Sequence, residues 1–244
     1  MIELLHGDCL DLMKGISDKS IDMILCDLPY GTTACKWDII IPFEPLWEQY
    51  KRIIKDKGCI ALFGSEPFSS YLRMSNIKNY KYDWIWNKKV GSNFASVNNQ
   101  PLKIHETVSI FNSRIYYPIK TFDTKKPFGK IVETEKTGVA PKTKKNKREQ
   151  GYPKSILIFP RVNNLVDGYF GHNSQKPIAI LEYLIKTYTL GGETILDNCM
   201  GSGSTGVACI NTNRNFIGIE KDDKYFEIAK NRIEQAQHDV APKV

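Results

Sequence analysis

Residues 20–31 read Ser-Ile-Asp-Met-Ile-Leu-Cys-Asp-Leu-Pro-Tyr-Gly. The apolar run Ile21–Cys26 has the length of a buried strand, and Pro29 and Gly31 end it. Asp27-Leu28-Pro29-Tyr30 is therefore expected on a loop at the carboxyl end of a strand, where open α/β sheets bind ligands. An acid, backbone carbonyl groups and an aromatic ring there suit a flat polar ligand. A turn with a capping Asp and a packed Tyr explains the same residues equally well.

Short apolar runs and helical periods alternate along the rest of the chain. Ile21–Cys26 is expected to be the first strand of the body. Further strands are predicted at 59–63, 82–86, 107–111, 193–197 and 215–220, and helices at 46–54, 71–74, 178–187, 204–210 and 224–235. After a basic insert, residues 155–159 bring the chain back to the body. Such alternation predicts an α/β fold with a mostly parallel sheet and helices on both of its faces.

Composition limits the class of protein. The 244 residues, with 41% hydrophobic and 25% charged, suit one α/β domain with or without an insertion. The first residues lack the basic region of a signal peptide, and no apolar run has the length of a membrane span. The six cysteines form no CxxC pair and the four histidines no cluster. These features predict a cytoplasmic protein with reduced thiols and no metal site.

The positive charge is concentrated in one segment. Residues 112–155 hold twelve Lys or Arg and four Asp or Glu, a net charge of +8, whereas the whole chain carries +7. A solvated flexible loop would have such a composition, but a concentrated basic segment also suits contact with the phosphates of a polyanion. The rest of the chain is close to neutral.

A glycine-rich loop forms a second candidate site. Gly201-Ser202-Gly203-Ser204-Thr205-Gly206 stands between a predicted strand and a predicted helix, and the next strand ends at Glu220. Sites for NAD, FAD and S-adenosylmethionine all use such a loop with an acid on the ribose. Here Asp197-Asn198-Cys199-Met200 lengthens the loop and adds a carboxylate. A carboxylate suits a sulfonium with an amino-acid tail better than a pyrophosphate, which favours S-adenosylmethionine over NAD.

The two sites together resemble the amino-methylating DNA methyltransferases, whose catalytic tetrad is usually Asp-Pro-Pro-Tyr. The catalytic segment precedes the cofactor loop, as in the circularly permuted beta group of that family. The resemblance implies a Rossmann-like S-adenosylmethionine-dependent methyltransferase fold. This chain departs from the family pattern at Leu28 and Asn173, which replace prolines, and at Cys199, which replaces an aromatic residue.

Other segments extend the resemblance over nearly the whole chain. Gly7-Asp8 is similar to the family's adenine-contacting acid, and 91–94 and 105–108 are similar to segments beside the target-base pocket. His172-Asn173-Ser174-Gln175-Lys176-Pro177 is similar to His-Pro-Thr-Gln-Lys-Pro. The resemblance divides the chain into a catalytic part at 1–111, a target-recognition insertion at 112–155 and a cofactor-binding part at 156–244.

The resemblance also implies functional residues. The catalytic residues are Asp27, Leu28, Pro29 and Tyr30. The cofactor-binding residues are Asp8, Cys9, Asp27, Lys176, Asp197, Asn198, Cys199, Gly201, Ser202, Gly203, Glu220 and Lys221. The DNA-binding residues are Lys88, Lys89, Asn93, His105, Lys142, Lys144, Lys145, Lys147 and Arg148.

The reaction implied is methyl transfer to the N6 amine of an adenine flipped out of duplex DNA. The Asp27 carboxylate and the Leu28 carbonyl would accept hydrogen bonds from that amine and stabilise the positive charge that develops on it. The Tyr30 ring would stack on the flipped base. Trp84 and Trp86, two residues apart, are expected to pack on the sheet rather than on bases.

Several alternatives stay open. N4-cytosine methylation uses the same chemistry, although its enzymes more often carry Ser at the position of Asp27. Transfer to RNA or to a protein amide uses a related tetrad that usually begins with Asn. A different class is a non-catalytic nucleic-acid-binding protein on a methyltransferase fold. C5-cytosine methylation is disfavoured, because no cysteine follows a proline. The partners implied are double-stranded DNA, a restriction endonuclease and a second copy of the chain in a homodimer.

Overall fold

The computed structural model describes residues 1–32, 38–120, 151–162 and 175–240. It divides the chain into two compact units. The larger unit joins Met1–Tyr117 to Ser155–Val244, and the smaller one is Pro118–Lys154. All the strands and helices below belong to the larger unit, which also holds the candidate site.

An eight-stranded sheet forms the centre of the larger unit, with the order β1-β8-β7-β2-β3-β5-β4-β6. Its strands are β1 (Ile2–His6), β2 (Ile21–Cys26), β3 (Ile54–Gly64), β4 (Tyr80–Ser92), β5 (Lys103–Phe111), β6 (Ile156–Ile158), β7 (Thr194–Asp197) and β8 (Asn215–Glu220). Strand β5 runs antiparallel to β3 and β4, and the other neighbouring pairs are parallel. The prediction of a mostly parallel sheet is confirmed.

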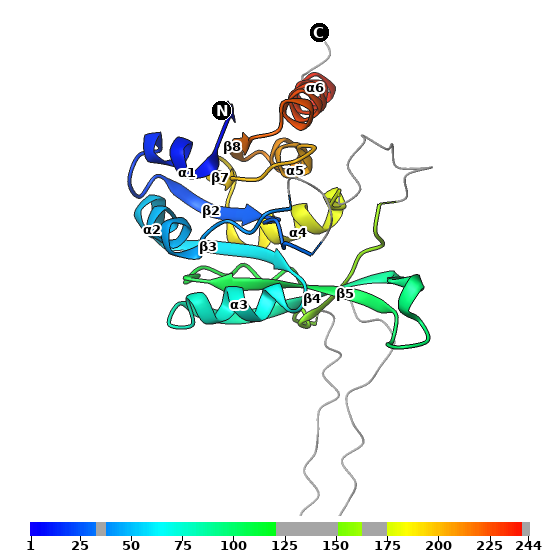
Figure 1. Cartoon of the computed structure of the whole chain (residues 1–244). Coiled ribbons are helices and arrows are strands. Elements are labelled where there is room, and N and C mark those ends of the chain that lie inside the picture. Colours follow the sequence, from blue (N-terminus) through cyan, green and yellow to red (C-terminus); the bar gives the residue numbers. More distant parts are fainter. Residues whose placement is uncertain (33–37, 121–150, 163–174, 241–244) are drawn as a thin grey trace, which may run out of the picture. The chain divides into compact units, whose positions relative to one another are not determined.

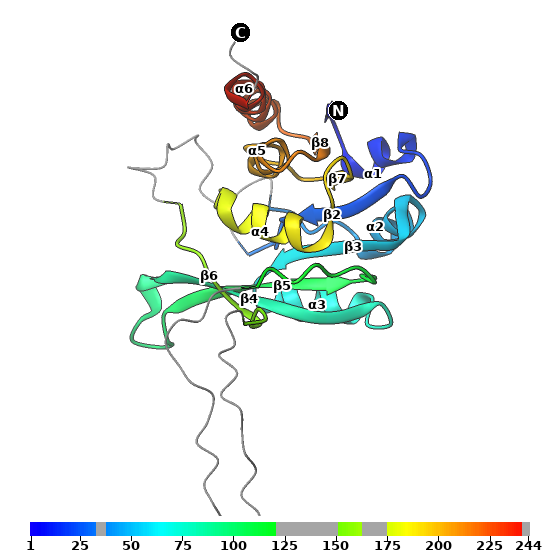
Figure 2. The ribbon, with the colours of Figure 1, turned by 180° about the vertical axis from the view of Figure 1, so that it is seen from behind.

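Helices cover both faces of this sheet, as the sequence pattern predicted. One face carries α1 (Cys9–Leu12), α2 (Phe43–Ile53) and α3 (Phe68–Ser75), with α2 and α3 in front of the sheet in Figure 1. The opposite face carries α4 (Ile178–Tyr188), α5 (Ser204–Asn211) and α6 (Asp223–Val240), seen from behind in Figure 2. Two 3-10 turns, η1 (Met13–Gly15) and η2 (Phe94–Ser96), complete the described elements. Within the described residues, no helix is both long and apolar enough to cross a membrane.

Strand β2 is buried on both sides, which explains its continuous apolar sequence. Met23 and Leu25 pack into the cluster that includes α4 and α5. Ile24 and Cys26 pack into the cluster that includes α2 and α3. Successive side chains of the strand thus point to opposite faces of the sheet. Because β2 ends at Cys26, the next residue, Asp27, lies at the carboxyl edge of the sheet.

One predicted feature of the sheet is wrong. Strand β2 is not the first strand, because β1 precedes it and pairs in parallel with β8. The mixed sequence of β1, with Glu3 and His6 among its apolar residues, lacks the uninterrupted apolar run of a buried strand. The strand lies at the edge of the sheet, where only part of its surface is covered.

Strands β4 and β5 extend beyond the predicted ranges 82–86 and 107–111. Trp84 and Trp86 are buried in the core, which confirms their expected packing on the sheet. Beyond the core the side chains are largely polar, but the backbone pairing continues as far as Ser92 and Lys103. The apolar alternation therefore ends before the hairpin does.

Candidate active site

Four acidic residues mark the carboxyl ends of four neighbouring strands. Asp197 and Glu220 are the last residues of β7 and β8, Asp27 directly follows β2, and Asp8 lies two residues after β1. In the order β1-β8-β7-β2 these strands are adjacent. The sheet thus gathers carboxylates along one edge, at the place where α/β sheets bind ligands.

The glycine-rich loop connects β7 to α5 and is fastened to the end of β8. The Gly201 amide donates to Glu220 Oε2 at 2.9 Å, and the Lys221 and Asp222 amides each donate to Glu220 Oε1 at 2.9 Å. Gly201 and Gly203 have φ values of +52° and +77°, a region that favours glycine. Both oxygens of Glu220 are thus oriented by backbone amides beside the loop.

Asp197 and Asn198 are buried where the loop begins. Asp197 accepts hydrogen bonds from the Thr205 hydroxyl at 2.6 Å and from the Cys199 amide at 3.1 Å. Burial raises the pKa of the Asp197 carboxyl to about 6. The Tyr50 hydroxyl, on α2, donates to Asn198 Oδ1 at 2.5 Å.

Helix α6 also supports the loop, through a residue that the sequence did not point to. Arg232 Nη1 donates to the Ser202 carbonyl at 3.0 Å and to the Ser204 hydroxyl at 2.9 Å. Burial lowers the pKa of the Arg232 guanidinium to about 10. Neither Arg232 nor Tyr50 belongs to a motif, so no local sequence signal identifies them.

Asp8 lies at the β1 end of the row β1-β8-β7-β2, and Asp27 lies at the β2 end. Its carboxylate accepts from the Leu10 amide at 3.0 Å and caps α1, and it pairs with Lys221 Nζ at 3.0 Å. The hydrogen bond from Lys221 lowers the pKa of Asp8. Both side chains keep substantial exposure, whereas the neighbouring Cys9 is buried in the apolar core.

In the loop after β2, the side chain of Tyr30 holds the carboxylate of Asp27. The Tyr30 hydroxyl donates to Asp27 Oδ1 at 2.6 Å. The Tyr30 ring stacks on Phe68, with ring centroids 5.0 Å apart. Downstream, Asp38 accepts from the Gly31 and Thr32 amides at 2.8 and 2.9 Å, which fixes the path of the loop. Leu28 is buried in the core and Pro29 is partly exposed.

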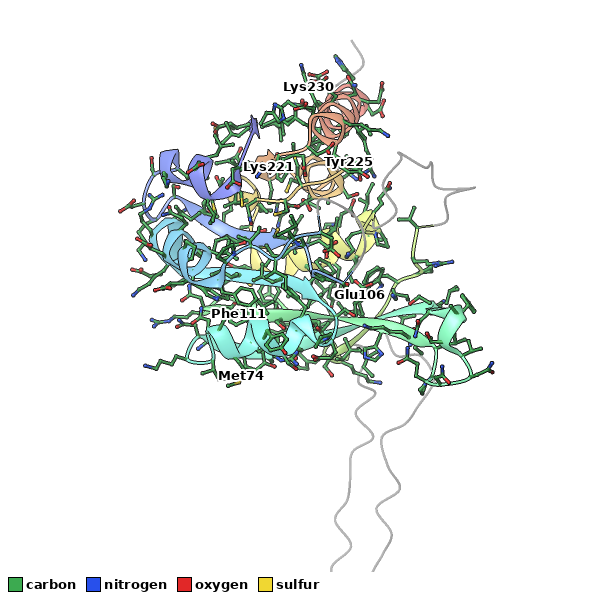
Figure 3. The ribbon with its side chains drawn as sticks, viewed as in Figure 1. Met74, Glu106, Phe111, Lys221, Tyr225 and Lys230 are labelled. Atoms are coloured by element: carbon green, nitrogen blue, oxygen red, sulfur yellow. The ribbon has the colours of Figure 1, made fainter. Side chains whose placement is uncertain are left out.

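Asp27 also belongs to a cluster of two partly buried acids and two buried lysines. Lys176 Nζ donates to Asp27 Oδ2 and lies 3.5 Å from Glu106 Oε2. Lys88 Nζ donates to Glu106 Oε1 at 3.0 Å. Glu106 of β5 and Lys221, directly after β8, are labelled in Figure 3. The cluster therefore joins the loop after β2 and the strands β4 and β5 to a residue two positions before α4.

Electrostatics in the cluster favour the charged forms of Glu106 and Lys176 in spite of burial, whereas at Asp27 burial prevails. Burial raises the pKa of the Asp27 carboxyl, and Lys176 opposes that shift. Burial also opposes ionisation of Glu106, but Lys176 and Lys88 outweigh it and lower the Glu106 pKa. Burial likewise opposes protonation of Lys176, but Asp27 and Glu106 raise its pKa. Glu106 was missed as a site residue, although it stands in the segment 105–108 that the sequence singled out.

The structure distributes the remaining predicted residues unevenly. Lys88 is buried against Glu106, whereas Lys89 and His105 are exposed on the hairpin and Asn93 adopts a φ of +74° there. Lys176 contacts Asp27, so its predicted contact with a cofactor stays a prediction. Five predicted DNA contacts lie outside the described residues, namely Lys142, Lys144, Lys145, Lys147 and Arg148. His172, Asn173 and Ser174 lie outside them as well.

The fold and this edge of the sheet agree with a comparison against known families. A family model described as DNA methylase matches residues 21–231. The chain belongs to the N6/N4 DNA methylase family. The methylase is 28% identical over 257 residues to the DNA adenine methyltransferase YhdJ of Escherichia coli (strain K12), covering 96% of this chain and 83% of YhdJ. It is 26% identical over 265 residues to the type II methyltransferase M.HinfI of Haemophilus influenzae, covering 95% and 68% of the two chains.

Solved structures share the fold of the methylase. The M1.HpyAVI–SAM complex has a TM-score of 0.66 at 23% identity, covering 96% of this chain and 99% of that one. The cytosine-N4-specific PvuII DNA methyltransferase also has a TM-score of 0.66, at 14% identity, covering 97% and 91%. The Rossmann-like methyltransferase fold predicted from the sequence is confirmed.

Proposed function

We propose that the methylase transfers a methyl group from S-adenosylmethionine to the N6 amine of an adenine flipped out of double-stranded DNA. The observation that carries the proposal is the position of Asp27, a carboxylate held at the end of β2 by Tyr30 and Lys176. A carboxylate is a suitable acceptor for an exocyclic amine. The similarity to the adenine methyltransferase YhdJ over 96% of the chain favours adenine as the target.

The chemistry of the residues at this edge fits the cofactor. Asp8, Asp27, Asp197 and Glu220 supply acceptors for the hydroxyl and amine groups of a nucleoside and for cationic groups. Residues 201–203 would let the backbone approach it closely, because glycines form the turn of this loop. When bound, S-adenosylmethionine supplies an electrophilic methyl group.

The residues of the tetrad would act on the target base. The Asp27 carboxylate and the Leu28 carbonyl would accept the two hydrogens of the amine, which favours a pyramidal nitrogen and offsets its developing positive charge. Loss of one such preorganised interaction costs about 3 kcal/mol in the barrier. Tyr30 would stack on the flipped base, an interaction of about 1–3 kcal/mol per base.

The decisive experiment identifies the methylated base. The purified chain is incubated with unmethylated genomic DNA and radiolabelled S-adenosylmethionine, and the DNA is digested to nucleosides for mass spectrometry. N6-methyladenine is expected. Asp27→Ala should lose methyl transfer by about 100-fold or more while DNA binding survives. Asp11→Asn, which removes a charge from an exposed ion pair, should behave as the parent chain. Binding of DNA without methyl transfer by any form would favour a non-catalytic DNA-binding protein.

N4-methylation of cytosine is the second candidate. It is supported by the fold shared with the cytosine-N4-specific PvuII enzyme, since both target amines need the same kind of acceptor. N4-methylcytosine in the digest would keep the cofactor and the acceptor role of Asp27 and would overturn the choice of base.

A further inference from the structure

Both oxygens of Asp27 are already engaged in the structure. Oδ1 accepts from the Tyr30 hydroxyl at 2.6 Å, and Oδ2 accepts from Lys176 Nζ. If Asp27 is the acceptor of the target amine, as in the proposed function, the amine has to compete with Lys176. The ammonium charge would also oppose the positive charge that develops on the amine. A place to which Lys176 can withdraw would remove both obstacles.

Glu106 offers such a place. Its Oε2 is buried and has no hydrogen-bond partner among the described residues, yet it lies 3.5 Å from Lys176 Nζ. A buried carboxylate oxygen without a donor is unfavourable, so a small movement of Lys176 toward it would satisfy that oxygen. Oε1 is held by Lys88 at 3.0 Å, which keeps Glu106 in place during such a movement.

The groups around Lys176 leave its charge balanced in either position. Asp27 faces it from the end of β2, Glu106 from β5, and the Phe63 ring of β3 lies 5.3 Å from Nζ. Lys88 of β4 lies on the far oxygen of Glu106. The two acids and two lysines therefore keep a net charge of zero in either position, and after the movement both lysines lie on Glu106.

We propose that Glu106 is a positioning residue, which takes the Lys176 ammonium from Asp27 when the target amine binds and so frees Asp27 Oδ2 to accept that amine. The movement itself involves no proton transfer, because the Lys176 ammonium only exchanges one carboxylate acceptor for another. In the free protein, Lys176 keeps Asp27 in the orientation needed for the base. The inference rests on the proposed role of Asp27 and adds the exchange of its partner.

The first test is a double-mutant cycle on the full chain. Glu106→Gln should lower the single-turnover rate of methyl transfer about 10–100-fold, with little change in the Kd for DNA or for S-adenosylmethionine. In a Lys176→Met background the same change should cost far less, because no ammonium remains to be withdrawn. Glu182→Gln, which removes a partly buried carboxylate paired with Lys186 on α4, is the matched control and should not alter the rate. An equal loss in both backgrounds, or no loss in either, would overturn the proposal.

The second test does not depend on activity. NMR of isotope-labelled lysine side chains would follow the titration of Lys176, identified by the signal that Lys176→Met removes. In Asp27→Asn the Lys176 pKa should stay close to its parent value, because Glu106 receives the ammonium. In Asp27→Asn with Glu106→Gln it should fall by about one unit or more. An equally large fall in Asp27→Asn alone would contradict the role of Glu106. If the parent chain methylates no DNA, the proposed function fails, and the titration still decides whether Glu106 captures Lys176.

Discussion

The Tyr50 hydroxyl donates a hydrogen bond to Asn198 Oδ1 at 2.5 Å across 148 residues of sequence. It connects α2, in the part of the chain that carries Asp27, to the start of the glycine-rich loop. Both residues are buried, and burial keeps the pKa of the Tyr50 hydroxyl well above its ordinary value, so it remains a donor. The geometry of the glycine-rich loop therefore depends on a residue outside every motif.

Tyr50→Phe tests this dependence. The substitution leaves the buried Asn198 oxygen without its donor, and we expect a loss of about 1–3 kcal/mol in the free energy of unfolding. The affinity for S-adenosylmethionine should decrease as well. Urea denaturation and calorimetric titration measure the two effects. Tyr71→Phe, on an exposed tyrosine of α3, should change neither. Equal stability of the two variants would mean that the hydrogen bond does not stabilise the loop.

Gly203 has two separate reasons to be glycine, and a second glycine allows them to be separated. Its φ is +77°, and an added Cβ would lie 3.0 Å from the Ala229 backbone of α6. Gly192 has a φ of +82° with nothing within 4 Å of its Cβ position. Gly192→Ala should therefore cost only the left-handed backbone, about 1–2 kcal/mol. Gly203→Ala should cost about 1–3 kcal/mol more, because α6 must also move away from the loop.

Urea denaturation of the two alanine variants measures this difference directly. Equal losses would show that α6 relaxes without cost and that the backbone conformation alone selects glycine at position 203. A larger loss of stability in Gly203→Ala would show that the close approach of α6 also selects glycine at position 203. Weaker binding of S-adenosylmethionine by the same variant would support a role for this loop in binding the cofactor.

The sequence predicted the parts of the site that are local in the chain. Asp27, Asp197 and Glu220 stand where an apolar strand ends, so each could be placed at the carboxyl edge of the sheet before the structure was known. The pairing of Lys176 with Asp27 spans 149 residues, and no periodicity or motif connects the two. Strand β1 was missed for a related reason: at the edge of the sheet its side chains need not be uniformly apolar. Long-range partners become visible only when the strand order is known.

The raised pKa of Asp197 predicts a pH-dependent stability. The pKa is about 6 in the folded protein and about 3.9 for an Asp in an unfolded chain. Between these values the folded state binds more protons than the unfolded state, so this group makes the protein less stable as the pH rises from about 4 to about 6. Above about pH 7 its effect is constant.

Asp197→Asn removes that titration. The difference in unfolding free energy between the variant and the parent should shift in favour of the variant by about 2–3 kcal/mol from pH 4 to pH 7. Urea denaturation at several pH values measures this difference. The comparison cancels the titration of groups that do not interact with Asp197. A difference that does not vary with pH would contradict the raised pKa of Asp197.

Lys88 and Lys89 are neighbours in sequence with different surroundings, and both were predicted to bind DNA. Lys88 is 8% exposed and its amine donates to Glu106, whereas Lys89 is exposed. If Lys89 contacts a phosphate, Lys89→Asn should reduce the slope of log K for DNA binding against log salt by about 0.9. Asparagine tolerates the φ of +62° at this position, so the backbone should stay unchanged.

Lys88→Met should give the opposite pattern. The salt dependence of DNA binding should stay as in the parent chain, because the buried amine is not available to a phosphate. The rate of methyl transfer should fall about 10–100-fold, because Glu106 loses the donor that holds it beside Lys176. Fluorescence anisotropy over a range of salt concentrations and single-turnover kinetics distinguish the two residues. A reduced salt slope in Lys88→Met with an unchanged rate would instead return Lys88 to the DNA surface.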